Sequence, residues 1–461
     1  MNRLKTLKDR VRRLLALLSL GVLFFSSCSL ADMIEFRDAD SGPAPYHAAE
    51  TETPKEPADL VHETIPIENE TDAQPDANPD PETDVDANAA AWIARYESLF
   101  GEGAADEILL TSEEIAAYNR RIIEECPTVV DIAAVPESME GKNVQGMLLI
   151  DLPAVELFND DGEHFSWDPV RANASTETVP DTVVPQRAVV TARCDMKSLP
   201  TSSGLFEGKD RYYSKIQLTE LIVGMPVWVL HESADGAFLF VQSYYYIGWI
   251  PSNAVALCDA EDYERFAKPE DPVVVLRHAV PCGETALDMG VALPFRAETE
   301  TGWTVSLPTR DEDGRLALAD FELKKDEAVH GYLPYTMRNT YTQAFACLGI
   351  PYGWGGTDGG LDCSGFVCAV FRTFGIYLPR DTRDQKDHAG IAHTGMTEEE
   401  TERLLKESRF PVCLYSPGHV MLYLGEVDGT PTVIHAPQGG ETVTLAPLEQ
   451  ERTLISLVEM K

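Results

Sequence analysis

The chain has 461 residues, enough for two to four domains at the usual size of about 100 to 200 residues each. Its formal net charge is −39, from 37 basic and 76 acidic side chains. Because nucleic-acid binding requires clustered Lys and Arg that contact phosphates, this balance argues against a nucleic-acid partner. The nine cysteines contain no C-x-x-C pair, so we expect no zinc site, no disulfide framework and no cofactor.

The first 27 residues have the pattern of an export signal. Basic residues between Arg3 and Arg13 precede an apolar run over residues 14–25 that is too short to span a bilayer comfortably. The following F-S-S-C-S resembles the lipobox of bacterial lipoproteins, which implies cleavage before Cys28 and lipidation of that cysteine. We therefore expect an exported protein, lipid-anchored to the cell membrane or the outer membrane. The alternative is ordinary cleavage nearby, with Cys28 an incidental thiol.

Residues 28–90 have the composition of a disordered acidic tether. Large apolar residues are scarce, and runs such as D-A-Q-P-D-A-N-P-D-P-E-T-D-V-D dominate. Such a segment cannot bury enough apolar surface to offset chain entropy, and its like charges repel one another. The tether is expected to hold the folded part of the chain away from the membrane.

Residues 91–180 read as an N-terminal helical segment. Apolar residues recur at helical spacing from Ala91, and T-S-E-E at residues 111–114 has the form of a capping box. The capping box predicts a helix that runs to Cys126 and is stopped by Pro127.

Short β-type runs fill residues 181–260 and again residues 261–336. G-W-I-P at residues 248–251 recurs as G-Y-L-P at residues 331–334, which indicates an internal repeat. Short strands at this spacing predict two small β-barrels.

After residue 336 the pattern returns to helices. One helix is predicted from about Thr340 to Gly349, and after a glycine-rich run a second begins at Cys363 and ends at Gly375. Unpaired N–H groups and the helix dipole favour an anion at a helix N-terminus. Since the thiolate is the nucleophilic form of cysteine, Cys363 is a candidate nucleophile.

Two candidate bases lie in a predicted hairpin that turns at Asp428-Gly429. If Leu424 pairs with Thr432, His435 falls opposite Met421 and shares a face of the sheet with His419. A slip of one residue would send His435 to the other face, and the pattern alone does not decide between the two registers. We expect His388 and His393, which lie in a polar stretch, to be surface residues.

Y-G-W-G-G-x-x-G-G-L-D-C-S-G-F, then L-P-R, P-G-H-V-M-L-Y-L-G and V-I-H-A, resemble the NlpC/P60 family of papain-like cysteine peptidases that cut bacterial cell-wall peptides. The resemblance is greatest to the branch with two bacterial SH3-like domains. It implies an α+β fold, in which a papain-like catalytic domain at residues 337–461 follows SH3-like domains at 181–260 and 261–336.

The resemblance also implies roles for single residues. Cys363 would be the nucleophile, His419 the general base and then acid, and His435 the residue that orients His419. The pocket for the first amino acids of the peptide would be lined by Tyr352, Trp354, Asp362 and Ser364. Many relatives have G-D before the strand that bears the base, whereas this chain has V-C-L-Y-S-P-G-H, so a contact from that aspartate is not assumed.

Asp362 raises a separate question, because a carboxylate beside a thiol raises the pKa of that thiol. We therefore expect Asp362 to pair with the ammonium group of a substrate. In the resembled branch the first SH3-like domain closes the end of the groove with a tyrosine and an acid. The run Tyr244-Tyr245-Tyr246 could supply the tyrosine, and the sequence does not say which one.

Together these features predict a lipid-anchored endopeptidase that cuts the γ-D-glutamyl-diamino acid bond of peptidoglycan stem peptides, L-Ala-γ-D-Glu-diamino acid, with a free N-terminal L-Ala. One alternative is a papain-like amidase or acyltransferase that acts on another amide, and Y-x-W with Asp362 argues against it. The other is a catalytically idle cell-wall-binding lipoprotein. The intact set of Cys363, His419 and His435 argues against that reading.

Overall fold

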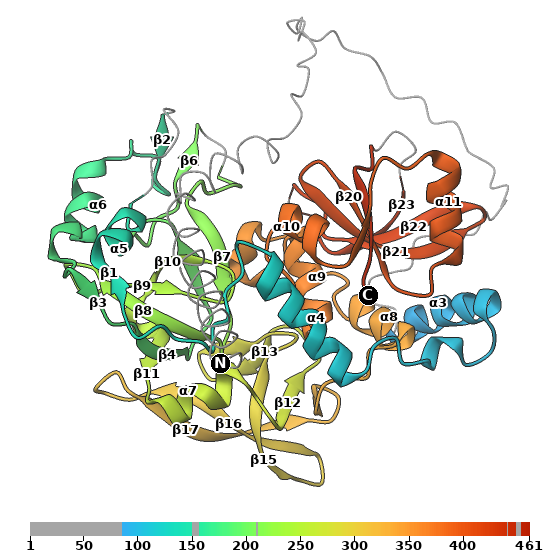
Figure 1. The fold of residues 1–461 in the computed structure, drawn as a ribbon, viewed down its shortest axis with the longest axis horizontal. Coiled ribbons are helices and arrows are strands. Elements are labelled where there is room, and N and C mark those ends of the chain that lie inside the picture. The colour runs from blue at the N-terminus through green and yellow to red at the C-terminus, as the bar shows by residue number, and fades with distance from the viewer. Residues whose placement is uncertain (1–84, 150–155, 209–210, 440, 449–452) are drawn as a thin grey trace, which may run out of the picture.

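The computed structural model describes residues 85–149, 156–208, 211–439, 441–448 and 453–461. The predicted signal peptide, the lipobox cysteine Cys28 and the tether up to residue 84 lie outside the described residues. Within the described ranges, no helix is both long and apolar enough to cross a bilayer. Figure 1 shows a C-terminal domain flanked by N-terminal helices, with two sheet-containing parts on its other side.

The first N-terminal helices pack on the C-terminal domain. Helix α3 starts ahead of the predicted Ala91, because Ala89 is already buried in the core shared with that domain. The capping box is confirmed, since Thr111 accepts from Glu114 N–H and the Glu114 carboxylate accepts from Thr111 N–H. Asn119 then hydrogen-bonds the carbonyl of Gly375 at 2.8 Å. The elements are α3 (Val85–Phe100), η2 (Ala104–Asp106) and α4 (Ser112–Glu125).

The rest of the predicted helical segment packs instead on the first sheet. Trp228 Nε1 donates to the carbonyl of Ile132 at 2.9 Å, and Trp249 Nε1 donates to that of Leu148 at 3.0 Å. The predicted helical segment, residues 91–180, therefore packs partly on the C-terminal domain and partly on the first sheet. The elements are β1 (Met139–Glu140), α5 (Gly141–Met147), β2 (Leu157–Phe158), α6 (Trp167–Ala174), η3 (Thr176–Thr178) and β3 (Thr182–Val183).

The first SH3-like domain is built on a seven-stranded sheet in the order β11-β4-β8-β9-β10-β5-β7. Most residues of its strands are buried, because both faces of the sheet are covered. One face packs on helices α5 and α6, and the other packs on the domain's own core. The elements are β4 (Gln186–Val190), β5 (Cys194–Lys197), β6 (Phe206–Glu207), β7 (Gln217–Leu221), β8 (Pro226–Glu232), β9 (Phe238–Gln242), β10 (Ile247–Pro251), η4 (Ser252–Ala254) and β11 (Val255–Leu257).

Residues 261–336, the predicted second SH3-like domain, contain a five-stranded sheet in the order β17-β16-β15-β12-β18 and a separate hairpin, β13-β14. The two segments of the predicted repeat lie in different elements: residues 248–251 belong to strand β10, whereas residues 331–334 follow strand β18, and Gly331 bridges Val273 of β12. The elements are α7 (Ala260–Ala267), β12 (Pro272–Val275), β13 (Val280–Cys282), β14 (Thr285–Leu287), β15 (Ala292–Glu298), β16 (Gly302–Arg310), β17 (Leu316–Lys324) and β18 (Ala328–His330).

The C-terminal domain packs helices on a six-stranded antiparallel sheet in the order β19-β24-β20-β21-β22-β23. Its first helix starts before the predicted Thr340, because Thr336 caps it by accepting from Asn339 N–H. The elements are α8 (Met337–Phe345), η5 (Trp354–Gly359), α9 (Cys363–Arg372), α10 (Thr382–His388), β19 (Ile391–His393), α11 (Glu398–Glu407), β20 (Val412–Ser416), β21 (His419–Val427), β22 (Thr430–His435), β23 (Thr444–Pro447) and β24 (Ser456–Glu459).

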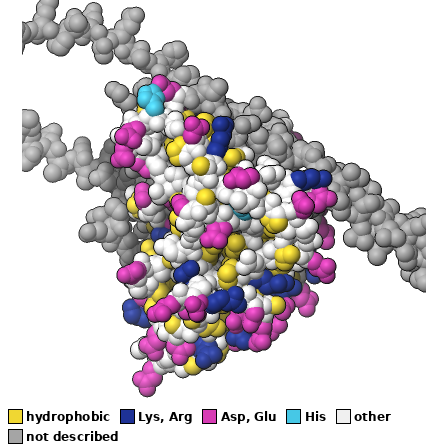
Figure 2. Space-filling view, turned by 90° about the vertical axis from the view of Figure 1, so that its left-hand side faces the viewer, with side chains coloured by type: hydrophobic (Ala, Val, Ile, Leu, Met, Phe, Trp, Pro, Cys, Tyr) yellow, Lys and Arg dark blue, Asp and Glu magenta, His cyan; other side chains and the backbone are white. Residues whose placement is uncertain are grey.

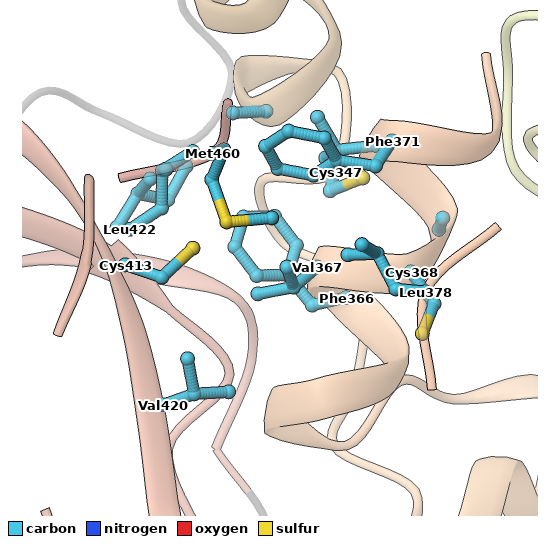
Figure 3. Close-up of a cluster of buried hydrophobic side chains, with 14 of the residues drawn as sticks. Cys347, Phe366, Val367, Cys368, Phe371, Leu378, Cys413, Val420, Leu422 and Met460 are labelled. Atoms are coloured by element: carbon cyan, nitrogen blue, oxygen red, sulfur yellow. The ribbon is translucent and has the colours of Figure 1, made fainter. Parts of the chain in front are cut away.

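The buried face of α9 holds this helix against the sheet. Phe366, Val367 and Phe371 face Val420 and Leu422 in a closely packed core (Figure 3). The same cluster includes Cys347, Cys368 and Cys413, so the prediction that Cys368 faces the core is confirmed. This packing fixes where the first residue of α9 sits relative to strand β21.

The surface carries the acidic excess in a dispersed form. On the face that Figure 2 shows, acidic side chains are spread over the described surface with basic ones between them, and hydrophobic side chains form small separate patches. An interspersed distribution of this kind is typical of a solvated protein surface.

Candidate active site

Cys363 is the first residue of helix α9, and the side chain of Asp362 caps that helix by accepting from Gly365 N–H at 2.7 Å. The thiol is buried, with only 5% of Cys363 exposed. The backbone N–H of Val420, which follows His419 at the start of β21, lowers the pKa of this thiol. The core contacts of α9 therefore bring the cysteine to the strand end that carries a predicted base.

Of the two registers considered for the hairpin, the structure has the one that places His435 on the same face as His419. Leu422 pairs with Ile434 and Tyr423 with Val433, which places His435 opposite Met421 and on the same face as His419. The register shifts by one residue at a bulge after Tyr423, so Thr432 pairs with Gly425 rather than with Leu424. The bulge lies between the two histidines and the turn, so the strand pairing next to His419 and His435 is not shifted.

His419 Nε2 lies 2.7 Å from His435 Nδ1, and both residues are buried. Their rings are nearly perpendicular, with centroids 5.0 Å apart and an angle of 73° between their planes. A hydrogen bond of this length fixes the plane of the His419 ring. The other two histidines of the polar stretch are partly exposed, and His393 hydrogen-bonds Glu459 at 3.0 Å.

Burial dominates the acidity of the nucleophile. It raises the pKa of the Cys363 thiol to about 12, and the charge of Asp362 raises it further, while the Val420 N–H and the Arg380 guanidinium act in the opposite direction. The expected stabilisation of a thiolate by the helix N-terminus is thus outweighed by burial. The thiol must pass its proton to a neighbouring base to become a nucleophile.

The structure gives Asp362 a partner that we did not expect. Its two carboxylate oxygens accept from Arg380, at 2.9 Å from Nη1 and 2.6 Å from Nη2. They also accept from the backbone N–H of Gly355 at 3.0 Å and that of Gly365. The charge of Asp362 therefore has a counter-charge within the protein, and its role as the counter-ion of a substrate ammonium stays a prediction.

Ser364 belongs to the same buried network. Its hydroxyl accepts from Arg380 Nη1 at 2.9 Å, and Arg380 Nε donates to Thr219 of strand β7 at 2.9 Å. Arg380 was visible in the sequence only as part of L-P-R. Its guanidinium joins the start of the catalytic helix to the first SH3-like domain, and no local pattern announces that contact.

Tyr352 and Trp354 lie where the resemblance implies a pocket. Tyr352 is buried, and the nearby Asp362 and Cys363 add to the effect of burial in raising the pKa of its phenol. Among the described residues, no hydrogen-bond partner is present for its hydroxyl. The ring of Trp354 meets that of Tyr213 edge to face, with centroids 5.3 Å apart. A buried hydroxyl that lacks a partner marks a place where a polar ligand group would bind.

The first SH3-like domain presses on the glycine-rich run. Gly355 and Gly356 have φ of +62° and +85°, and a Cβ at either would lie 2.8 Å from Gln217 and 2.7 Å from Glu220, respectively. Only glycine fits this conformation and this contact together. Strand β7 thus forms one wall beside the segment that carries Trp354.

The hydroxyls of the Tyr244-Tyr245-Tyr246 run, one of which was considered for closing the groove, contact other residues of the protein. Tyr244 donates to the carbonyl of Tyr377 at 2.7 Å, Tyr246 donates to Asp381 at 2.6 Å, and Tyr245 is buried beside Met225. The first SH3-like domain reaches the candidate pocket with Tyr213 instead, a residue that sequence reasoning missed. The polar loop around Tyr213 carries no periodic signal that would single it out.

Comparison with known proteins agrees with this architecture. Residues 349–457 match the NlpC/P60 family, and residues 202–251 match the SH3 domain (SH3b1 type). The chain is 33% identical over 254 residues to the gamma-D-glutamyl-L-lysine dipeptidyl-peptidase of Bacillus cereus (strain ATCC 10987 / NRS 248), over 50% of this chain and 70% of that protein. It is 27% identical over 249 residues to the dipeptidyl-peptidase 6 of Lysinibacillus sphaericus, over 51% of this chain and 85% of that protein.

Among solved structures, an NlpC/P60 endopeptidase from Photobacterium damselae subsp. piscicida aligns with a TM-score of 0.62 and 18% identity, over 79% of this chain and 96% of that chain. This likeness shows a shared fold. The protein is thus a cysteine peptidase, with its catalytic domain preceded by an SH3-like domain. The chain belongs to the NlpC/P60 family.

Proposed function

We propose that the protein is a peptidoglycan endopeptidase that hydrolyses the γ-D-glutamyl-diamino acid bond of stem peptides. The observation that carries this proposal is the pairing of His419 with His435 at 2.7 Å, next in the chain to Val420, whose backbone N–H lowers the pKa of the Cys363 thiol. The name of the Bacillus cereus relative, a gamma-D-glutamyl-L-lysine dipeptidyl-peptidase, supports the same bond.

The geometry supports a division of roles between the two imidazoles. If His419 donates its Nε2–H to His435 Nδ1, its own Nδ1 keeps a lone pair and can take the proton of Cys363. The thiolate then attacks the carbonyl carbon of the γ-glutamyl bond, and the backbone N–H of Cys363 serves as one donor to the oxyanion.

The remaining steps return the enzyme to its starting state. The C–N bond breaks as His419 gives its proton to the departing amine, which leaves the γ-glutamyl group as a thioester on Cys363. His419 next takes a proton from water, and the resulting hydroxide attacks the thioester carbonyl. The thiolate that leaves is reprotonated by His419.

The proposed substrate has a free N-terminal L-Ala. Both curated relatives are named dipeptidyl-peptidases, and removal of a dipeptide requires that the groove end near the amino terminus of the peptide. Strand β5 brings Asp195 to the same side as the glycine-rich run, where Gln217 Nε2 lies 2.9 Å from Asp195 Oδ1 and 3.4 Å from Gly355 O. Asp195 and Tyr213 are our candidates for the acid and the tyrosine that close the groove.

The test compares free L-Ala-γ-D-Glu-diaminopimelate with its N-acetylated form, with products identified by mass spectrometry. We expect the free peptide to have a kcat/KM at least about a hundredfold higher, equivalent to roughly 2.7 kcal/mol. Asp195→Asn should reduce that ratio, and Cys363→Ala should cut neither peptide. Equal kcat/KM for the two peptides would reject the closed groove, and cleavage at another bond would reject the proposed function.

A further inference from the structure

The second SH3-like domain also reaches the glycine-rich segment of the active site. His278, in the chain between β12 and β13, points its Nε2 at the carbonyl oxygen of Gly359, 2.8 Å away. A carbonyl oxygen only accepts, so Nε2 carries the proton of this hydrogen bond. The His278 side chain is 7% exposed. A domain that supplies none of the predicted catalytic residues thus holds the last residue of η5.

A buried charge network surrounds that imidazole. Its Nδ1 lies 3.2 Å from Asp288 Oδ1 without a hydrogen bond between the two atoms, and Asp288 Oδ2 accepts from Arg193 Nε at 2.9 Å. The same Arg193 Nε lies 3.0 Å from Glu220 Oε1 of strand β7. The network therefore ties the first SH3-like domain to the second at the point where both touch the glycine-rich segment.

Position 359 favours glycine. Gly359 has a φ of +70°, and a Cβ there would meet the end of the Arg193 side chain, which is paired with Asp288. Asp358, just before it, also has a positive φ of 57°, which is unfavourable for a residue with a side chain. The surroundings must hold such a backbone in place, because the segment would relax without them.

Few hydrogen bonds hold the segment from outside. Within it, Gly356 N–H donates to Gly353 O at 2.9 Å and Gly360 N–H to Thr357 O at 3.1 Å. Near its start, the segment is held by the bond from Gly355 N–H to Asp362 and by the bond from Gln217 Nε2 to Gly355 O at 3.4 Å. The bond from His278 holds the far end, beyond Trp354.

We propose that His278 is a positioning residue, through which the second SH3-like domain sets the conformation of residues 353–360 and so the pocket wall that carries Trp354. The part of this inference that concerns catalysis rests on the proposed function. Since His278 touches neither Cys363 nor the histidine pair, its loss is expected to weaken substrate binding more than the chemical step.

The kinetic test uses two substitutions of similar length that differ in one property. His278→Gln keeps an N–H donor, and His278→Met removes it. We expect His278→Met to raise KM for the free stem peptide about five- to tenfold, the factor that one ordinary hydrogen bond allows, with kcat changed less than about twofold. His278→Gln should stay within about twofold of the wild type in both. His330→Met is the matched control, because His330 belongs to the same domain but pairs with Asp271 at the surface.

A second measurement does not depend on any substrate. Amide hydrogen exchange over residues 350–362 should be at least about threefold faster in His278→Met than in the wild type, and unchanged in His278→Gln and His330→Met. If wild-type protein cuts no stem peptide, the proposed function fails while this measurement still decides the positioning role. Asp288→Asn, which weakens the pairing with Arg193 beside Gly359, should change exchange in the same direction and serves if His278→Met does not fold.

Equal exchange in the Gln and Met variants would overturn the inference, because the two differ only in the donor to Gly359. A faster exchange that is spread over the whole second domain in both variants would also overturn it, since that result shows a role in domain stability alone. A kcat that falls as much as KM rises in His278→Met would show that the contact acts on the chemical step.

Discussion

His419 and His435, which lie on neighbouring strands and are separated by a hairpin, form a buried hydrogen bond of 2.7 Å between Nε2 and Nδ1. The relationship depends on the pairing of Leu422 with Ile434, because a shift of one residue would point His435 to the opposite face of the sheet. The bulge after Tyr423 keeps this register compatible with the turn at Asp428 and Gly429, both of which have positive φ.

Replacement of the nucleophile should abolish catalysis without loss of the fold. Cys363→Ala is expected to leave less than about 1% of wild-type kcat/KM, since no other thiol lies at the helix start. Cys368→Ala is a suitable control, because Cys368 faces the core of the same helix. Hydrolysis should be measured together with the thermal unfolding midpoint. Activity above a few per cent in Cys363→Ala would contradict the assignment.

The two histidines should differ in their effect. His419→Ala removes the proposed base and should lower kcat about as much as Cys363→Ala does. His435→Ala should lower kcat less, because water can replace part of an orienting hydrogen bond. His435→Asn, which can still accept from His419 Nε2, should recover part of that loss. If His435→Ala proved more damaging than His419→Ala, the proposed roles of base and orienting residue would have to be exchanged.

The acidity of the thiol gives a prediction for pH. Burial and Asp362 raise the pKa of Cys363 to about 12, so with the base removed the thiolate fraction should increase about tenfold per pH unit up to that value. In His419→Ala, the rate of alkylation of Cys363 by iodoacetamide should therefore rise throughout pH 7 to 10. The modified residue is identified by peptide mass spectrometry. A plateau near pH 8 would show an unperturbed thiol.

Arg380 should be needed for stability as well as for the site. Its side chain and that of Asp362 are 8% and 10% exposed, and removal of one partner leaves the other charge buried without its counter-ion. Arg380→Met is expected to lower the free energy of unfolding by about 3 kcal/mol. Arg403→Met on the exposed face of α11 should change it by less than about 0.5 kcal/mol. Denaturant titration of both variants measures the difference, and equal stabilities would contradict the buried pair.

Lipidation can be tested independently of the folded part. In cells grown with labelled palmitate, wild-type protein should incorporate the label and Cys28→Ser should not, because the proposed anchor is attached to that sulfur. The Cys28→Ser protein should also leave the membrane fraction. Equal labelling of the two proteins would show that the lipobox interpretation is wrong.

The sequence by itself determined the features whose signal is local. The helix start at Cys363 follows from the glycine-rich run and the apolar spacing behind it, and the capping box at Thr111 follows from two residues three positions apart. The hairpin pattern restricted His435 to two registers, one of which the structure shows. Each of these depends on backbone preferences over a few neighbouring residues.

Only the tertiary structure decided which remote surfaces meet. The pairing of Asp362 with Arg380, the contact of Tyr213 with Trp354 and the bond from His278 to Gly359 join side chains from different parts of the chain. A local pattern indicates that a residue is polar or apolar, and it cannot tell which distant group the packing of three domains will bring beside it. The burial that raises the pKa of Cys363 has the same origin, because desolvation depends on everything that surrounds the thiol rather than on its neighbours in the sequence.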